Sequence, residues 1–178
     1  MTMSSSIPAS SAADGTQAGD ARAKRELLRH AVATLAYRGA KAIRGAPSSV
    51  GGFRAGEVTR TPLQILAHLG DLLEWALSLA EGNQRWHVGT PGTWEDESAR
   101  FFAALSQLDT YLASDRPLGC PAEKLLQGPV ADGLTHVGQI VMLRRLANAP
   151  VRSENFFIAG IVAGRVGDDQ AAPKFEFD

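Results

Sequence analysis

One stretch decides the fold class: residues 61–82, with the sequence TPLQILAHLGDLLEWALSLAEG. Thr61, Pro62 and Gln64 mark a helix start, with a capping threonine, a proline at the first helical position and a glutamine for a capping box. Gly82 is a natural helix end. Between them, apolar residues recur at the three- and four-residue spacing of an amphipathic helix: Ile65, Leu66, Leu69, Leu72, Leu73, Ala76, Leu77 and Ala80.

Three further helices are predicted outward from this one. The first covers residues 21–44, with Asp20 as its cap. Its apolar stripe consists of Leu27, Leu28, Ala31, Leu35, Ala42 and Ile43. Thr93 caps a helix that ends near residue 114, and Pro129 opens another that ends near residue 147, after a short helical piece at 123–127. No stretch alternates with period two, so the chain is predicted to be all-α, a four-helix bundle with one long crossover.

The 178 residues suit a single domain. Residues 1–20 are rich in Ser, Ala, Gly and Asp and are predicted to be a flexible tail. Residues 21–178 form the predicted bundle, with a C-terminal extension whose Phe156, Phe157 and Ile158 pack back onto it.

The charge balance excludes strongly electrostatic partners. With 18 basic and 19 acidic residues the formal net charge is −1, which favours neither nucleic acid nor a membrane surface. Arg144 and Arg145 are interpreted as a solvated helix end. No apolar run of about 18 residues is present and the N-terminus resembles no signal peptide, so we expect a cytoplasmic protein. Cys120 is the only cysteine, and we interpret it as an incidental loop residue rather than a nucleophile.

The most informative polar residue of the quoted stretch is His68, which lies on the apolar face of its predicted helix. A buried histidine needs partners for its ring nitrogens, so it is either a hydrogen-bonded core residue or a metal ligand or general base. The residue alone does not distinguish these alternatives.

A second polar group falls on the last predicted helix. Asp132, His136 and Gln139 follow one another at spacings of four and three residues and therefore share a stripe. Together with His68 from a facing helix, Asp132 and His136 would supply two imidazoles and one carboxylate, a metal-ligand set with open positions for water or substrate. Asp132 could instead cap its helix or lie in its first turn as a partner of the helix dipole. Gln139 is expected to make an interhelical hydrogen bond, or else to lie beside the ligands at the pocket.

Other residues are expected near such a site. Asp71 and Trp75 follow His68 along the same helix and could line a pocket beside it. The loops 45–60 and 83–92 would frame the pocket, with Trp86 and His87 at its rim.

The segment 61–71 followed by Trp75, and the segment 134–140 with its His136-Val137-Gly138-Gln139, resemble two motifs of the DinB-like superfamily, which includes the YfiT-like metal-dependent hydrolases. The resemblance covers about residues 21–150. It implies an up-down-down-up four-helix bundle, often a homodimer, that holds a metal with three histidines. His68 and His136 match two of these, whereas Asp132 stands where the pattern has the third.

The resemblance also implies a function. Members with known activity are thiol-dependent transferases or isomerases, so we expect one divalent ion (Zn, Ni, Fe or Mn), a small-molecule substrate and a low-molecular-weight thiol. A hydrolase that uses metal-bound water is the nearest variant. The alternative is a non-catalytic dimeric stress-response or ligand-binding bundle whose metal is structural or absent, which the aspartate at position 132 favours.

Overall fold

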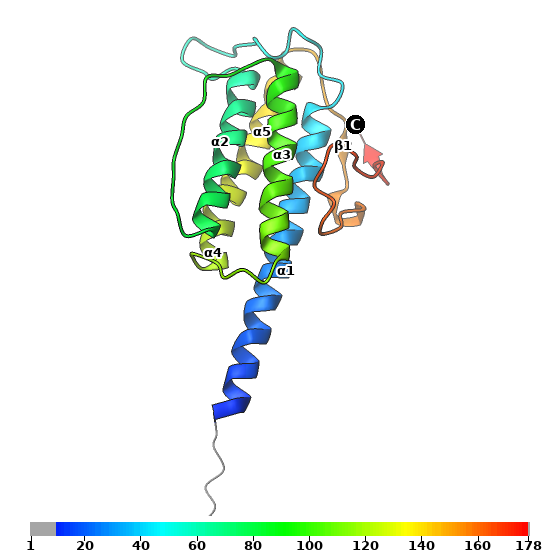
Figure 1. Ribbon diagram of the computed structural model, residues 1–178. Coiled ribbons are helices and arrows are strands. Elements are labelled where there is room, and N and C mark those ends of the chain that lie inside the picture. The colour runs from blue at the N-terminus through cyan, green and yellow to red at the C-terminus, as the bar shows by residue number, and fades with distance from the viewer. Residues whose placement is uncertain (1–9, 178) are drawn as a thin grey trace, which may run out of the picture.

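The computed structural model describes residues 10–177 and is mostly helical, as predicted (Figure 1). The long helices are α1 (Ser10–Ile43), α2 (Pro62–Ala80), α3 (Trp94–Ala113) and α5 (Ala131–Leu146). A short helix α4 (Ala122–Leu125) and a π-helical turn (Leu126–Val130) lead into α5. Beyond α5 lie a 3₁₀ turn (Phe156–Ile158) and two short antiparallel strands, β1 (Ser153–Glu154) and β2 (Glu176–Phe177).

The start of α2 is built as its sequence predicts. The Thr61 hydroxyl accepts a hydrogen bond from the Gln64 backbone N–H at 3.2 Å, and the Gln64 side chain accepts one from the Thr61 N–H at 2.9 Å. Thr93 and Asp96 form the same reciprocal box at the start of α3. Each box satisfies backbone donors that a helix start leaves unpaired, and so fixes where the helix begins.

The long helices share one core. Helix α2 packs against α3 and α5, and α1 packs against the same two helices. The largest fully buried side chains come from all four, among them Leu35, Leu69, Phe101 and Ile140. The connection between α2 and α3, residues 81–93, runs along α2 from one end of the molecule to the other (Figure 1).

The structure corrects the predicted start of α1. Residues 10–20, expected in the flexible tail, continue the helix, which extends past the other helices (Figure 1); residues 1–9 lie outside the described residues. This stretch holds no proline, and its three alanines favour a helix, although Gly15 and Gly19 each disfavour one. Asp20, expected as a cap, lies inside α1 and pairs with Lys24 at 2.8 Å. Leu27, assigned to the apolar stripe, is 64% exposed because it lies on the outer side of α1.

The predicted start of the last helix is also wrong. Pro129 does not open α5 but lies within the π-helical turn that joins α4 to α5. Gly128, with φ −88° and ψ −105°, takes the non-helical backbone at that junction. A wide π turn tolerates a proline because it already breaks the regular hydrogen-bond ladder.

At the end of α5, Arg145 is exposed as predicted, whereas Arg144 is buried. Arg144 is only 5% exposed. Its guanidinium donates to the backbone carbonyls of Ala42 at 2.7 Å and Arg44 at 3.0 Å, where α1 ends. A cation at a helix C-terminus satisfies the last carbonyls and opposes the helix dipole.

The segment after α5 lies along α1. The buried Glu154 carboxylate accepts a hydrogen bond from the Tyr37 hydroxyl at 2.6 Å and pairs with Lys41 at 2.9 Å. Phe156 packs edge-on against Tyr37. Phe157, expected to pack as well, is 95% exposed. Across residues 10–177, no helix combines the length and the apolar character needed to cross a membrane.

Candidate metal centre

The structure brings together the three residues predicted as ligands. His68 comes from α2, and Asp132 and His136 come from successive turns of α5. Each offers one ligand atom, and these three atoms lie within 4.8 Å of one another. The set forms because α2 packs against α5 with both histidines turned toward the shared face.

The two imidazole rings meet edge to face. Their centroids lie 4.8 Å apart and their planes are inclined by 87°. His136 Nε2 lies 3.4 Å from Asp132 Oδ1. The His136 side chain is 12% exposed and that of Asp132 49%, so the centre is closed on the helix side and open to solvent at the carboxylate.

Gln139 determines which nitrogen of His136 faces this centre. His136 Nδ1 lies 2.9 Å from Gln139 Oε1. An amide oxygen only accepts, so Nδ1 donates in this bond. Nε2 is the nitrogen that faces Asp132, and it carries a lone pair whenever the ring is neutral. Two lone-pair donors that face each other fit a cation between them, and a second hydrogen bond of this kind is what orients metal-binding histidines. The expected interhelical bond of Gln139 is wrong: the bond lies within α5.

The surroundings of His68 favour its neutral form. Burial lowers the pKa of His68, and the positive charges of His136 and Arg60 lower it further. Asp132 and Asp71 act in the opposite direction but do not outweigh these effects. A metal binds the neutral imidazole, so this environment suits a ligand.

The alternative role of Asp132 as a helix cap finds no support. Asp132 lies in the first turn of α5, just after the kink at Gly128, where a carboxylate also interacts favourably with the helix dipole. No capping hydrogen bond of its side chain occurs within residues 10–177, and its ionic contact is with His136. The carboxylate is therefore available as a ligand.

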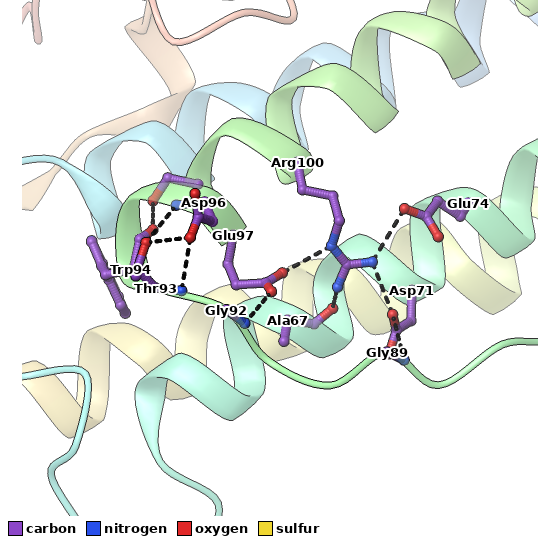
Figure 2. Close-up of polar contacts among 11 residues, drawn as sticks. Ala67, Asp71, Glu74, Gly89, Gly92, Thr93, Trp94, Asp96, Glu97 and Arg100 are labelled. Atoms are coloured by element: carbon purple, nitrogen blue, oxygen red, sulfur yellow. Dashed lines mark hydrogen bonds and ion pairs between the residues drawn. The ribbon is translucent and has the colours of Figure 1, made fainter.

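Asp71 lines a cavity with Trp75, as expected, and also joins separate elements of the fold. It is 3% exposed, and its Oδ1 accepts a hydrogen bond from Arg100 Nη1 at 2.9 Å and from the Gly89 N–H at 3.4 Å (Figure 2). Asp71 thus ties the 81–93 connection and α3 to α2.

Arg100 is the centre of this network, which the sequence did not reveal. Its guanidinium also pairs with Glu97 at 2.8 Å and Glu74 at 3.1 Å, and donates to the Ala67 carbonyl at 2.6 Å (Figure 2). Ala67 immediately precedes His68, so the network fixes the turn of α2 that carries the ligand. Arg100 lies on α3, whereas Asp71 and Glu74 lie on α2, so no regular spacing in the sequence indicates that they pair.

An aromatic wall adjoins the histidines. Trp86, from the connection after α2, packs edge-on against both His68, at 5.9 Å between centroids, and Trp75, at 5.6 Å. Trp75 Nε1 is buried without a hydrogen-bond partner among the described residues. Asp71, Trp75 and His87 border a cavity of about 240 Å³, as expected of them, whereas Trp86 does not line it.

Cys120 and His30 take no part in the centre. Burial raises the pKa of the Cys120 thiol, which keeps it protonated and agrees with an incidental role. His30 is exposed on α1.

Comparison of the chain with protein-family models, curated proteins and solved structures finds no match. The chemistry of the centre is therefore the basis for a functional assignment. Two imidazoles and a carboxylate, open on one side, are a donor set for a divalent ion that keeps positions for exogenous ligands.

Proposed function

We propose that this protein binds one divalent metal ion through His68, Asp132 and His136 and uses it in a thiol transfer or hydrolysis on a small molecule. The observation that carries the proposal is the approach of the three ligand atoms to within 4.8 Å, with Gln139 holding His136 in the tautomer a metal needs. Zn, Ni, Fe and Mn ions all accept such a set of nitrogen and oxygen donors.

Each chain residue has a distinct task in this proposal. His68 and His136 supply neutral nitrogen donors, and Asp132 supplies the negative charge that partly neutralises the ion. A bound ion of this kind supplies Lewis acidity, which lowers the pKa of a coordinated water or thiol and yields a nucleophile at neutral pH. The exposed side at Asp132 is the route by which a substrate or a low-molecular-weight thiol reaches the centre.

The aromatic wall supports a small organic substrate. Trp75 and Trp86 offer apolar surface next to His68, against which a small organic group can pack. In this assignment the wall binds and orients the substrate, while the 81–93 connection shields the reacting atoms from water.

The family, the helix topology, the oligomeric state and the location of the protein are part of the same proposal. We assign the helices to a DinB-like bundle with up-down-down-up topology, dimeric and cytoplasmic, as the resemblance of the α2 and α5 motifs implies. The connection along the length of α2 supports this topology, because it lets α2 and α3 start at the same end (Figure 1).

A non-catalytic role is the second candidate, and the exposure of Asp132 favours it. A carboxylate that is half in solvent holds an ion less tightly than a third buried imidazole would, so the ion could serve only stability or be absent. If the ion is structural, its removal lowers the melting temperature strongly.

Activity assays on matched variants test the catalytic proposal. Metal-loaded protein is screened with model electrophiles in the presence and absence of cysteine or glutathione, and for hydrolysis of model esters and amides. We expect an activity that His136→Ala abolishes and His30→Ala preserves, since His30 is exposed on α1. Activity that survives His136→Ala would refute a catalytic role of the centre.

A further inference from the structure

We infer that the cavity between α1, α5 and β1 is a binding site for a small organic anion with an apolar body. The cavity has a volume of about 330 Å³, within the range of small-ligand pockets. Its walls combine the cations Arg38, Lys41 and Arg145 with the apolar side chains of Val137, Val141 and Phe156. The metal ligands His68, Asp132 and His136 are not part of these walls.

Two guanidinium groups in the wall have no carboxylate partner within residues 10–177. Arg38 lies over the Phe156 ring, at 4.5 Å from its centroid. Arg145 makes only a long hydrogen bond to the Ser153 hydroxyl, at 3.3 Å. Both groups are therefore available to an oxyanion, and a planar guanidinium can bind a carboxylate or a phosphate through two parallel hydrogen bonds.

A neighbouring cavity of about 250 Å³ extends the basic surface, since Lys41, Val151 and Arg152 line both. Arg44 and Arg144 line this second cavity, and their hydrogen bonds go to backbone carbonyls, for example Arg44 to Asp168 at 2.6 Å. Arg144, near the end of α5, is already bound to the backbone carbonyls at the end of α1.

The charges of the two walls do not balance. Among the described residues they contain six cations, namely Arg38, Lys41, Arg44, Arg144, Arg145 and Arg152. Against these stand two carboxylates, Glu154 and Glu176, already paired with Lys41 at 2.9 Å and Arg152 at 3.3 Å. An excess of four positive charges, in a chain of net charge −1, favours an anion in these cavities.

The apolar part of the wall restricts the ligand class. An inorganic ion would leave Val141 and Phe156 partly facing water, whereas an aromatic or acyl group covers them. The matching ligand therefore has an apolar body and one carboxylate or phosphate head.

Isothermal titration calorimetry with phenyl phosphate, benzoate and neutral benzyl alcohol tests the inference. We expect saturable binding of at least one anion, which identifies the head group, and much weaker binding of benzyl alcohol. Arg38→Gln and Arg145→Gln each remove a charge-assisted hydrogen bond and should weaken binding about tenfold. Arg22→Gln, an exposed arginine of α1 outside both walls, should have no effect.

Gly138→Leu offers a variant that keeps every charge. A Cβ atom at Gly138 meets nothing within 4 Å, so a leucine side chain has room in the folded protein and occupies the cavity. We expect it to abolish binding. His68→Ala, by contrast, should bind the anion like the parent, which separates this site from the metal centre.

Three results would overturn the inference. The first is no saturable binding of either anion at millimolar concentration. The second is equal affinity for benzyl alcohol, and the third is an affinity that Arg38→Gln, Arg145→Gln and Gly138→Leu leave unchanged.

Discussion

A Cβ atom on Gly70 would lie 2.5 Å from the guanidinium carbon of Arg100, so the arginine crosses α2 where that helix has no side chain. This close approach lets Arg100 reach the Ala67 carbonyl and the Asp71 carboxylate on either side of Gly70. The contact joins α3 to the turn of α2 that carries His68 (Figure 2).

Gly70→Ala should therefore destabilise the protein, although alanine is the better helix former. Arg100 is held by four partners and cannot move aside without losing hydrogen bonds, so we expect a loss of about 1–3 kcal/mol in the free energy of unfolding. Urea denaturation measures it. Gly138→Ala, in the interior of α5 with open space around its Cβ, is the control and should stabilise by up to about 1 kcal/mol. Equal effects of the two variants would contradict the packing role of Gly70.

Gln139→Leu should weaken metal binding without touching a ligand. The change removes the acceptor that keeps the hydrogen on His136 Nδ1, and loss of such a partner lowers affinity by roughly 10- to 100-fold. Competition with a chromophoric chelator measures the dissociation constant. Gln17→Leu, on an exposed position of α1, should leave it unchanged. An unaltered constant in Gln139→Leu would show that the hydrogen bond does not orient the ligand.

Substitutions of Asp132 test whether its carboxylate binds the metal. Asp132→Asn removes the negative charge and should weaken binding of every divalent ion. Asp132→His creates the three-histidine set that the resemblance implies and should retain binding, with a preference shifted toward Zn and Ni over Mn. If both variants bind all four metals like the parent, Asp132 is not a ligand.

The cap of α3 makes a prediction about pH. The Thr93 hydroxyl and backbone N–H donate to Asp96 and lower the pKa of its carboxyl. A carboxyl whose pKa is lower in the folded state stabilises the fold above its ordinary pKa, and that contribution is lost as the pH falls through the lower, folded value. Thr93→Val should move the pKa of Asp96 back toward its ordinary value, as measured by NMR titration.

Thr110→Val is the matched control for this titration. Thr110 lies near the other end of α3, and its hydroxyl donates to the Ser106 carbonyl rather than to a carboxylate. Its replacement should leave the pKa of Asp96 unchanged. A shift of the same size in both variants would show that the cap is not the cause.

Local signals in the sequence predicted most of the helices. The capping boxes at Thr61 and Thr93 fixed two helix starts because they depend only on residues three apart. The sequence predicted neither the start of α1 nor the π-helical turn at Pro129, because alanine and proline each suit several backbone environments. The contacts of Arg100 with α2 and the burial of Arg144 were not predicted, because both depend on residues far apart in the chain.

In the candidate site, too, some features follow from local spacing in the sequence and others do not. Helical spacing predicted that Asp132 and His136 share a face, and the apolar stripe of α2 predicted that His68 points inward. The bond between Gln139 and His136 agrees with their three-residue spacing on α5. No spacing rule could predict that Trp86 from a loop packs on His68, because that contact depends on how the chain folds back.

The most direct test of the metal centre is the metal content of untagged protein, measured by elemental analysis after incubation with Zn, Ni, Fe and Mn salts and gel filtration. The account predicts about one ion per chain, lost in His68→Ala and in His136→Ala but kept in His30→Ala. Parent protein without metal, or full metal content in both ligand variants, would contradict it.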